Sequence, residues 1–327
     1  MESTRELPSA GLALGLDGRV RNVLGGVKVG RLLPHFFFAA LFVAVLWPKQ
    51  GDVSPWYLVG LLAAIECIAI LRIRFAKTGV AKKSAGDVAV IIFAFILAWH
   101  FATVRFGLVD PLLIPPPEAV LKLFVSELPD MLVGLQNSLI LLTSGYLLAL
   151  ATAIPLGLLI GWRRRVFHAV HPFTKVLGTI PPVVYIPYAI HFLPSFRTAS
   201  ISVIFSGACW PIFINTLSGV FNGPRGLVDS ARVLNLPQRT LLFRVILPAS
   251  LPAICSGATL GLCFSFLMLT AAEVIGGSSG IGWYVHNFAD FADYARVIVG
   301  ILFIGVVVTA ITAATERLER HLLRWRV

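Results

Sequence analysis

The sequence has little charge for its length. Only 13% of its 327 residues are Asp, Glu, Lys or Arg, whereas 57% are hydrophobic. A soluble domain carries about 25% charged residues, so this chain has too little charge to cover a surface that faces water. Long apolar runs recur from Leu32 to the C-terminus. These features predict a membrane protein with the lipid bilayer as its main solvent.

The sequence also has few groups that bind metals or carry out chemistry. Its four cysteines lie in apolar segments and form no CxxC pair, which argues against a disulfide framework and against a zinc site. Its seven histidines show no ligand spacing such as HExxH, and no GxxxxGK(S/T) sequence is present to bind a nucleotide phosphate. We therefore expect no metal site, no catalytic residue and no cofactor in this chain.

The net charge of +11 does not indicate a nucleic-acid-binding protein. The basic residues lie in short clusters between apolar runs and form no stripe interleaved with aromatic residues. The positive charge is instead expected to report how the chain is oriented in the membrane. Residues 1–30 are polar and glycine-rich without an apolar h-region, so we expect a cytoplasmic N-terminal tail rather than a cleavable signal peptide.

The apolar runs predict an all-α, polytopic membrane protein with about eight transmembrane helices, since a spanning helix needs roughly 20 residues. Placing the N-terminus in the cytoplasm puts 22 of the 27 Lys and Arg residues in cytoplasmic segments, so both termini are expected to be cytoplasmic. The predicted segments are 32–48, 55–73, 86–106, 135–161, 172–193, 198–220, 248–275 and 295–315.

One predicted cytoplasmic loop, residues 222–245, differs from the others. It opens with the turn signal Asn222-Gly223-Pro224, and a short helix over 227–236 is expected to end at Pro237. The apolar positions that share one face of this helix are Leu227, Ala231 and Leu234. Such a face in a basic loop is buried either by a partner protein or by the inner membrane surface, and the residues alone leave both open.

The same loop resembles the cytoplasmic signature of bacterial ABC importer permeases. That signature reads Glu-Ala-Ala, three residues, Gly, nine residues, and then Ile-x-Leu-Pro. Every interval fits this sequence, although the first, second, Gly and Ile positions carry Asp, Ser, Asn and Val. The matching residues are Asp229, Ser230, Ala231, Asn235, Val245, Ile246, Leu247 and Pro248.

Flanking segments resemble the nitrate/sulfonate/taurine-type permeases in the same order. They are Ile180-Pro181-Pro182 with Ile186-Pro187, then 210–216, 271–282 and 316–325. The resemblance covers about residues 86–327. It implies a six-helix permease core over 86–327 with a coupling helix near 226–237. The segment 31–85 is then expected to be two additional N-terminal transmembrane helices.

The resemblance implies a transport subunit of an ATP-driven importer, not an enzyme, in the bacterial cytoplasmic (inner) membrane. The implied partners are two cytoplasmic ATPase subunits carrying ATP and Mg²⁺, a second permease copy or a paralogue, and an extracytoplasmic solute-binding protein. The solute pathway would lie at the permease dimer interface and work by alternating access. The residues expected to couple to the ATPase are Leu227, Asp229, Ser230, Ala231, Arg232, Leu234, Asn235, Leu236, Leu247 and Pro248.

Several residues in the predicted core are candidates for the solute pathway. Pro181, Pro182 and Pro187 interrupt the fifth segment. Such a break is tolerated at membrane depth where the backbone faces protein or a cavity. Tyr185, Tyr188 and His191 either line the pathway or belong to an interfacial aromatic belt. Asn215 either lines the pathway or hydrogen-bonds a neighbouring helix. The candidates are Pro181, Pro182, Tyr185, Pro187, Tyr188, His191, Asn215 and Glu273.

Two intramembrane carboxylates are predicted, and such groups are usually functional or paired. Glu273 is expected either to gate the pathway or to pair with Arg197 or Arg296. Glu66, in the second segment, is expected to reach Arg72 or Arg74 or to contact the core.

The alternative to an importer subunit is a secondary transporter or channel that is not coupled to an ATPase. Such a protein would need intramembrane charges and usually inverted repeats, and the sequence shows no repeat and only these two carboxylates. The resemblance suggests a small oxyanion, a sulfonate or a related organic acid as the solute. It leaves open whether the permease pair is a homodimer or a heterodimer.

Overall fold

The structure is a computed structural model that describes residues 29–46, 55–76, 78–223 and 225–324. The tail predicted over residues 1–30 therefore lies almost wholly outside the described residues. The described part of the chain is helical throughout and divides into two compact units at Leu123 and Phe124. We describe each unit separately.

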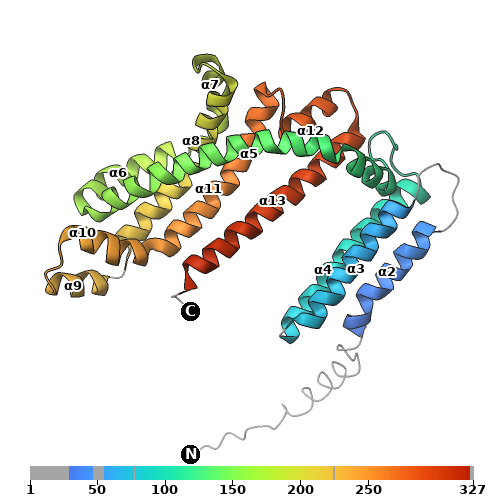
Figure 1. The fold of residues 1–327 in the computed structure, drawn as a ribbon, viewed down its shortest axis with the longest axis horizontal. Coiled ribbons are helices and arrows are strands. Elements are labelled where there is room, and N and C mark those ends of the chain that lie inside the picture. The colour runs from blue at the N-terminus through green and yellow to red at the C-terminus, as the bar shows by residue number, and fades with distance from the viewer. Residues whose placement is uncertain (1–28, 47–54, 77, 224, 325–327) are drawn as a thin grey trace, which may run out of the picture. The chain divides into compact units, whose positions relative to one another are not determined.

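The first unit is built on three helices, α2 (Val29–Leu46), α3 (Trp56–Phe75) and α4 (Gly79–His100), which pack side by side (Figure 1). A five-residue π-helical turn, Phe101–Arg105, continues α4. Two polar links join the parts of this unit. Glu66 of α3 pairs with His35 of α2, rather than with the arginines expected from the sequence. His100 Nδ1 lies 2.7 Å from Glu118 Oε1. The largest fully buried apolar side chains of its described residues are Leu41, Leu58, Leu62, Phe93 and Val120.

The second unit begins within α5 (Pro117–Trp162), a continuous helix of 46 residues. At a rise of 1.5 Å per residue this helix is about 69 Å long. The sequence predicted a span over 135–161. The helix in the structure begins 18 residues earlier, at Pro117, although it contains Pro129 and Pro155.

Two long helices form the centre of the second unit, α8 (Phe196–Phe221) and α11 (Leu247–Gly276). They approach closely because Gly257 and Gly261 of α11 face α8 without side chains. A Cβ on Gly257 would lie 2.7 Å from Asn215 Cβ, and one on Gly261 would lie 2.8 Å from a carbon of Ile212. Small residues four apart are a common means of close helix packing in membranes.

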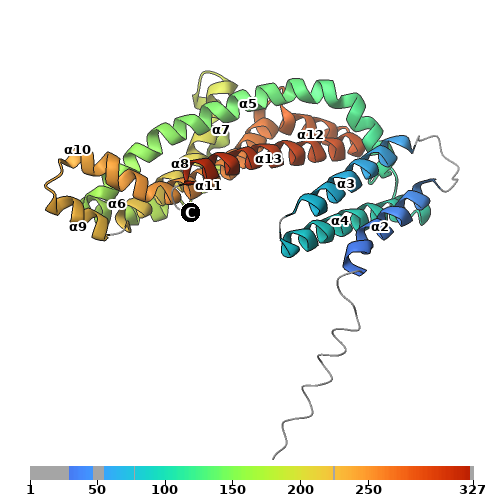
Figure 2. The same cartoon turned by 60° about the horizontal axis from the view of Figure 1, so that its bottom comes forward.

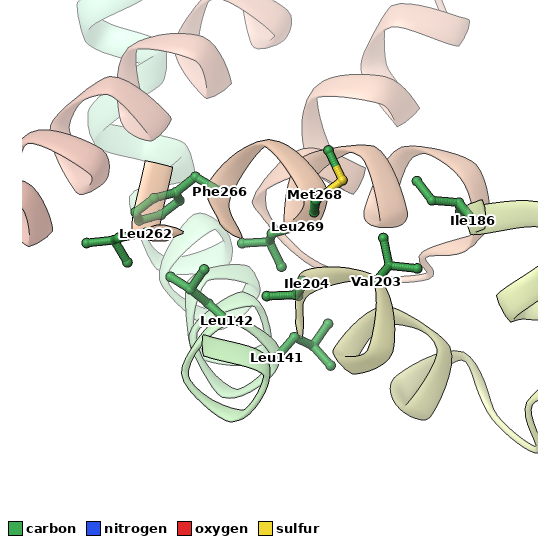
Figure 3. Close-up of a cluster of buried hydrophobic side chains, with 9 residues drawn as sticks. All are labelled: Leu141, Leu142, Ile186, Val203, Ile204, Leu262, Phe266, Met268 and Leu269. Carbon is green, nitrogen blue, oxygen red and sulfur yellow. The ribbon is translucent and has the colours of Figure 1, made fainter. Parts of the chain in front are cut away.

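The core of this unit joins four helices (Figure 3). Tyr146 of α5 adds a polar tie, since its hydroxyl donates to the carbonyl of Ala258 on α11 at 3.0 Å. The clustered side chains come from α5, α7, α8 and α11: Leu141, Leu142, Ile186, Val203, Ile204, Leu262, Phe266, Met268 and Leu269.

The predicted fifth segment, 172–193, is not one helix. It comprises the end of α6 (Arg164–Leu177), a break, a 3-10 turn (Pro182–Tyr185) and the short α7 (Ile186–Phe192). The break coincides with Pro181 and Pro182, which have no backbone N–H to continue a helix. The rings of Phe167 and Phe221 stack 3.7 Å apart and hold α6 against α8.

The remaining helices complete the second unit. The loop after α8 contains α9 (Arg225–Val233), α10 (Gln238–Thr240) and a π-helical turn (Leu241–Ile246). Figures 1 and 2 both show α6, α9 and α10 gathered at one end of the unit. After α11 come α12 (Ile281–Asp290) and α13 (Tyr294–Leu322).

Five helical stretches in the described residues are long and apolar enough to cross a membrane, which makes this a multi-pass membrane protein. The prediction of eight spans with both termini in the cytoplasm stays a prediction. The five stretches are Gly79–Arg105, Pro117–Trp162, Phe196–Phe221, Gln238–Gly276 and Tyr294–Leu322.

Candidate functional site

The loop between α8 and α11 is organised by a defined helix end. Helix α9 ends at Val233, earlier than the sequence predicted, because Asn235 adopts a left-handed backbone with φ of 50°. The N–H of Leu236 then reaches the carbonyl of Ala231 at 3.3 Å. This is the pattern in which a left-handed residue closes a helix, a place that glycine usually fills and asparagine sometimes does. Asn235 stands where the permease signature has Gly, and this conformation explains why Asn is tolerated there.

Helix α9 is held against its own chain. Ala231 is 5% exposed and packs in a cluster with Leu158 at the end of α5 and Val220 at the end of α8. Leu241 and Ile246 of the π-helical turn complete the cluster. Ala231 therefore connects α9 to three other elements through close-packed side chains.

The apolar positions of the loop do not share one face, which corrects the prediction for Ala231 and Leu234. Ala231 points inward, whereas Leu234 is 71% exposed because it lies beyond the helix end. Val233, at that end, is 82% exposed. The side chains of Leu227 and Arg232 lie outside what the structure describes. The other predicted coupling residues of α9 and its exit, Asp229, Ser230, Asn235 and Leu236, are exposed.

Pro248 lies where the sequence predicted, in the first turn of α11 after Leu247. The π-helical turn before it is itself helical, so the chain forms one helical stretch from Gln238 to Gly276. The preceding π-helical turn carries Ile246, which is 4% exposed and packs under Ala231. The loop is thus continuous with α11 through a packed segment.

The proline-rich candidates lie at the other end of α8. This helix has 26 residues and is about 39 Å long, and α7 precedes it directly while α9 follows it. Tyr185 is 39% exposed and Tyr188 is 65% exposed, and His191 is also exposed. Pro181 and Pro187 are exposed, and Pro182 is half-buried. The structure therefore brings these six residues together on one short segment.

Asn215 is half-buried in the middle of α8. Its side-chain amide donates to the carbonyl of Pro211 at 2.8 Å, within its own helix. This differs from the hydrogen bond to a neighbouring helix that was one of the two expected roles of Asn215. The Cβ of Asn215 lies at the close approach to Gly257, so its backbone position also supports the contact of α8 with α11.

Glu273 is fully buried and lies in a cage of hydrogen bonds. Ser138 Oγ on α5 donates to its Oε1 at 2.5 Å, and the N–H of Gly282 donates to its Oε2 at 2.7 Å. The N–H of Ile281 donates to Ser138 Oγ at 3.0 Å. The carboxylate thus accepts from the first turn of α12, where the helix dipole favours negative charge.

The ion pair expected between Glu273 and Arg296 does not form, which corrects the sequence interpretation. Arg296 instead donates to Glu127 Oε1 at 3.0 Å and to Asp293 Oδ2 at 2.6 Å. The hydroxyl of Tyr284 donates to Glu127 Oε2 at 3.3 Å. Burial raises the pKa of Tyr284, and the neighbouring Glu127 carboxylate raises it further. This network ties α5, α12 and α13 together.

Sequence reasoning missed the partners of these carboxylates. Ser138 and Glu127 are ordinary residues of a long helix, and no local pattern connects them with α12. The run of glycines after Glu273 was the available signal. Gly280 has φ of 130°, and a Cβ there would overlap the Glu273 carboxylate. The glycines therefore let backbone N–H groups reach a buried acid.

Comparisons with known proteins match much of the second unit to one family. The family described as "Binding-protein-dependent transport system inner membrane component" matches residues 153–324. The nitrate import permease protein NrtB of Leptolyngbya laminosa is 37% identical over half of this chain, and the match spans 58% of that relative's length. The putative aliphatic sulfonates transport permease protein SsuC of Bacillus subtilis is 31% identical, over 67% of this chain and 80% of SsuC.

A solved structure has a similar fold. It is titled as an inward-facing conformation of the MetNI methionine ABC transporter, and the TM-score is 0.54 at 17% identity. The likeness covers 60% of this chain and 98% of that one. At this identity the comparison supports the fold alone.

Proposed function

The chain belongs to the binding-protein-dependent transport system inner membrane components, the permease family of ABC importers, and from that premise we propose that it forms half of a solute pathway driven by a separate ATPase. Its partners would be two cytoplasmic ATPase subunits, a second permease copy or a paralogue, and an extracytoplasmic solute-binding protein. The location would be the bacterial inner membrane.

The exposed end of α9 carries this proposal. Val233, the last residue of α9, and Leu234, which follows it, are large apolar side chains at 82% and 71% exposure. The helix itself is packed into the chain through Ala231. Exposed apolar groups on a rigid element suit burial in a groove of a partner. An ATPase that bound here would move α9, and the cluster around Ala231 would pass that motion to α5, α8 and α11.

The proposed solute is a small anion, an oxyanion or a sulfonate. The relatives named for nitrate and for aliphatic sulfonates support this class. On this chain the exposed hydroxyls of Tyr185 and Tyr188 and the ring of His191 are the groups proposed to meet the solute. They offer hydrogen-bond donors without a fixed negative charge, which suits an anion that must bind and then leave.

The test is co-purification of the ATPase with the full chain from bacterial membranes. Leu234→Glu should abolish recovery of the ATPase, because it places a charge in the proposed contact without entering the core. Ser84→Glu is the matched control, since it adds the same charge at another exposed position in a predicted cytoplasmic segment. Ala231→Glu is less informative, because Ala231 is buried and the change would unseat α9.

Two results would contradict the proposal. One is full recovery of the ATPase with Leu234→Glu. The other is solute uptake by the purified chain in liposomes without ATP or an ATPase, which would point to a secondary transporter.

A further inference from the structure

A hollow beside α10 has no role in the proposed transport cycle. It measures about 420 Å³ and lies between the junction of α5 with α6 and the start of the π-helical turn. Two arginines line it, Arg163 from the junction and Arg239 from α10. They come from segments far apart in the sequence, so the fold itself brings the two positive charges to one hollow.

The described walls of this hollow do not balance its charge. Among the described residues that line it there is no Asp or Glu. Both guanidinium groups are exposed, and within the described part of the chain neither forms a salt bridge. A neighbouring hollow of about 400 Å³ differs in that Asp229 lines it together with Arg164. The hollow at Arg163 and Arg239 is therefore the one suited to an anion.

The rest of the wall is apolar, which distinguishes a lipid from a free anion. Leu159, Trp162 and Leu242 line the hollow together with the arginines. Leu159 is 58% exposed, and Leu156 one turn before it is 50% exposed. The membrane-spanning α5 thus presents an exposed apolar strip next to the arginines. A lipid could place its acyl chain along this strip and its headgroup at the arginines.

The hollow also lies at the expected depth of the lipid headgroups. It is located at the C-terminal end of α5, and the distribution of Lys and Arg predicts that this end lies at the cytoplasmic surface. Basic pockets between helices on that side bind the headgroups of anionic lipids, and tryptophan is enriched at the same level. We propose that Arg163 and Arg239 bind the phosphate of an anionic phospholipid, whose acyl chain lies along Leu159 and Leu156.

This lipid would stabilise the loop that contains α9. Helix α10, which carries Arg239, is followed directly by the π-helical turn, whose Leu241 and Ile246 pack in one cluster with Ala231. A phosphate shared by Arg163 and Arg239 would join the end of α5 to that turn and hold the turn in its packed position. The lipid would therefore favour the seated form of α9. This consequence for transport rests on the proposed function, whereas the lipid site itself does not.

The test measures lipid retained by the purified full chain with native mass spectrometry. Phosphatidylglycerol should be retained over phosphatidylcholine. The double variant R163Q/R239Q should bind phosphatidylglycerol about thirtyfold more weakly. Each basic residue near a membrane surface strengthens binding about five- to sixfold, and two such residues are removed. R163K/R239K should keep most of the retention because the charge is kept.

The matched control is R72Q/R74Q, which removes two exposed arginines at the end of α3. It should leave retention unchanged. Equal loss in R72Q/R74Q and R163Q/R239Q would overturn the proposal in favour of general surface attraction. Equal retention of the two lipids by the unmodified chain would overturn it without any variant. Displacement of the lipid by millimolar inorganic phosphate would assign the arginines to a free anion instead.

Discussion

Ser138 and Glu273 lie 135 residues apart in the sequence, yet the hydroxyl of Ser138 lies 2.5 Å from the Glu273 carboxylate in a fully buried position. The same hydroxyl accepts the N–H of Ile281 at the start of α12. One serine thus links α5, α11 and α12. A buried carboxylate is costly unless its oxygens are satisfied, so this link decides whether α12 stays seated.

The glycine beside this cage should not tolerate a side chain. Gly280→Ala would push a methyl group into the Glu273 carboxylate at a φ of 130° that L-residues rarely adopt. We expect a loss of about 1–3 kcal/mol in the free energy of unfolding, which is typical of overpacking. Thermal unfolding in detergent measures it. Gly60→Ala is the control, because nothing lies within 4 Å of a Cβ there. Equal midpoints for the two variants would refute the prediction.

Asn235 should be replaceable by glycine but not by a branched residue. Asn235→Gly keeps the left-handed conformation without strain, whereas Asn235→Val must pay about 1–2 kcal/mol for it. The readout is hydrogen exchange at the Leu236 amide, which closes the end of α9 on Ala231. Exchange should be slow in the parent and in Asn235→Gly and faster in Asn235→Val. Unchanged protection in Asn235→Val would show that this end of α9 does not depend on the left-handed residue.

The contact of α8 with α11 should depend on Gly261. Gly261→Val would place branched carbons against Ile212 and the carbonyl of Ala208, which lies 3.1 Å from a Cβ at this position. We expect the variant to unfold at a lower temperature by an amount that corresponds to about 1–3 kcal/mol. Gly305→Val on α13 has no neighbour within 4 Å and should unfold like the parent. If both variants behave alike, the close approach of α8 and α11 is not limiting for stability.

Tyr284 should make stability depend on pH in the alkaline range. Its pKa is raised in the folded state by burial and by Glu127, so the folded chain holds the phenol proton more tightly than the unfolded chain. The stability that comes from this proton is fully present below the unfolded pKa of about 10 and is lost as the pH rises above it.

Tyr284→Phe removes both the proton and the hydrogen bond to Glu127. At pH 8 the free energy of unfolding of the parent should exceed that of this variant by about 0.5–1.5 kcal/mol, and the difference should decrease above pH 10. Unfolding midpoints measured between pH 8 and pH 11 provide the comparison, with the exposed Tyr57→Phe as the control. A stability difference between the parent and Tyr284→Phe that stays constant over this range would exclude a contribution from Tyr284 ionisation.

The local features of this protein follow from its sequence. The shortage of charge required lipid as solvent, and runs of apolar residues produced α4, α8, α11 and α13 near the predicted positions, because helix formation depends on neighbours three and four residues apart. The place of α9 and of Pro248 followed from turn signals and from the signature spacing. The left-handed backbone of Asn235, in contrast, was found only in the structure.

Only the tertiary structure decided which groups meet. Ala231 is buried and Leu234 is exposed. Glu273 accepts hydrogen bonds from Ser138 and Gly282 and does not pair with Arg296. The predicted fifth segment is divided between α6, a 3-10 turn and α7. The tertiary structure also brought Arg163 and Arg239 to one hollow. Such contacts join residues from different helices, and helical periodicity records which face of a helix is apolar but not which partner covers that face.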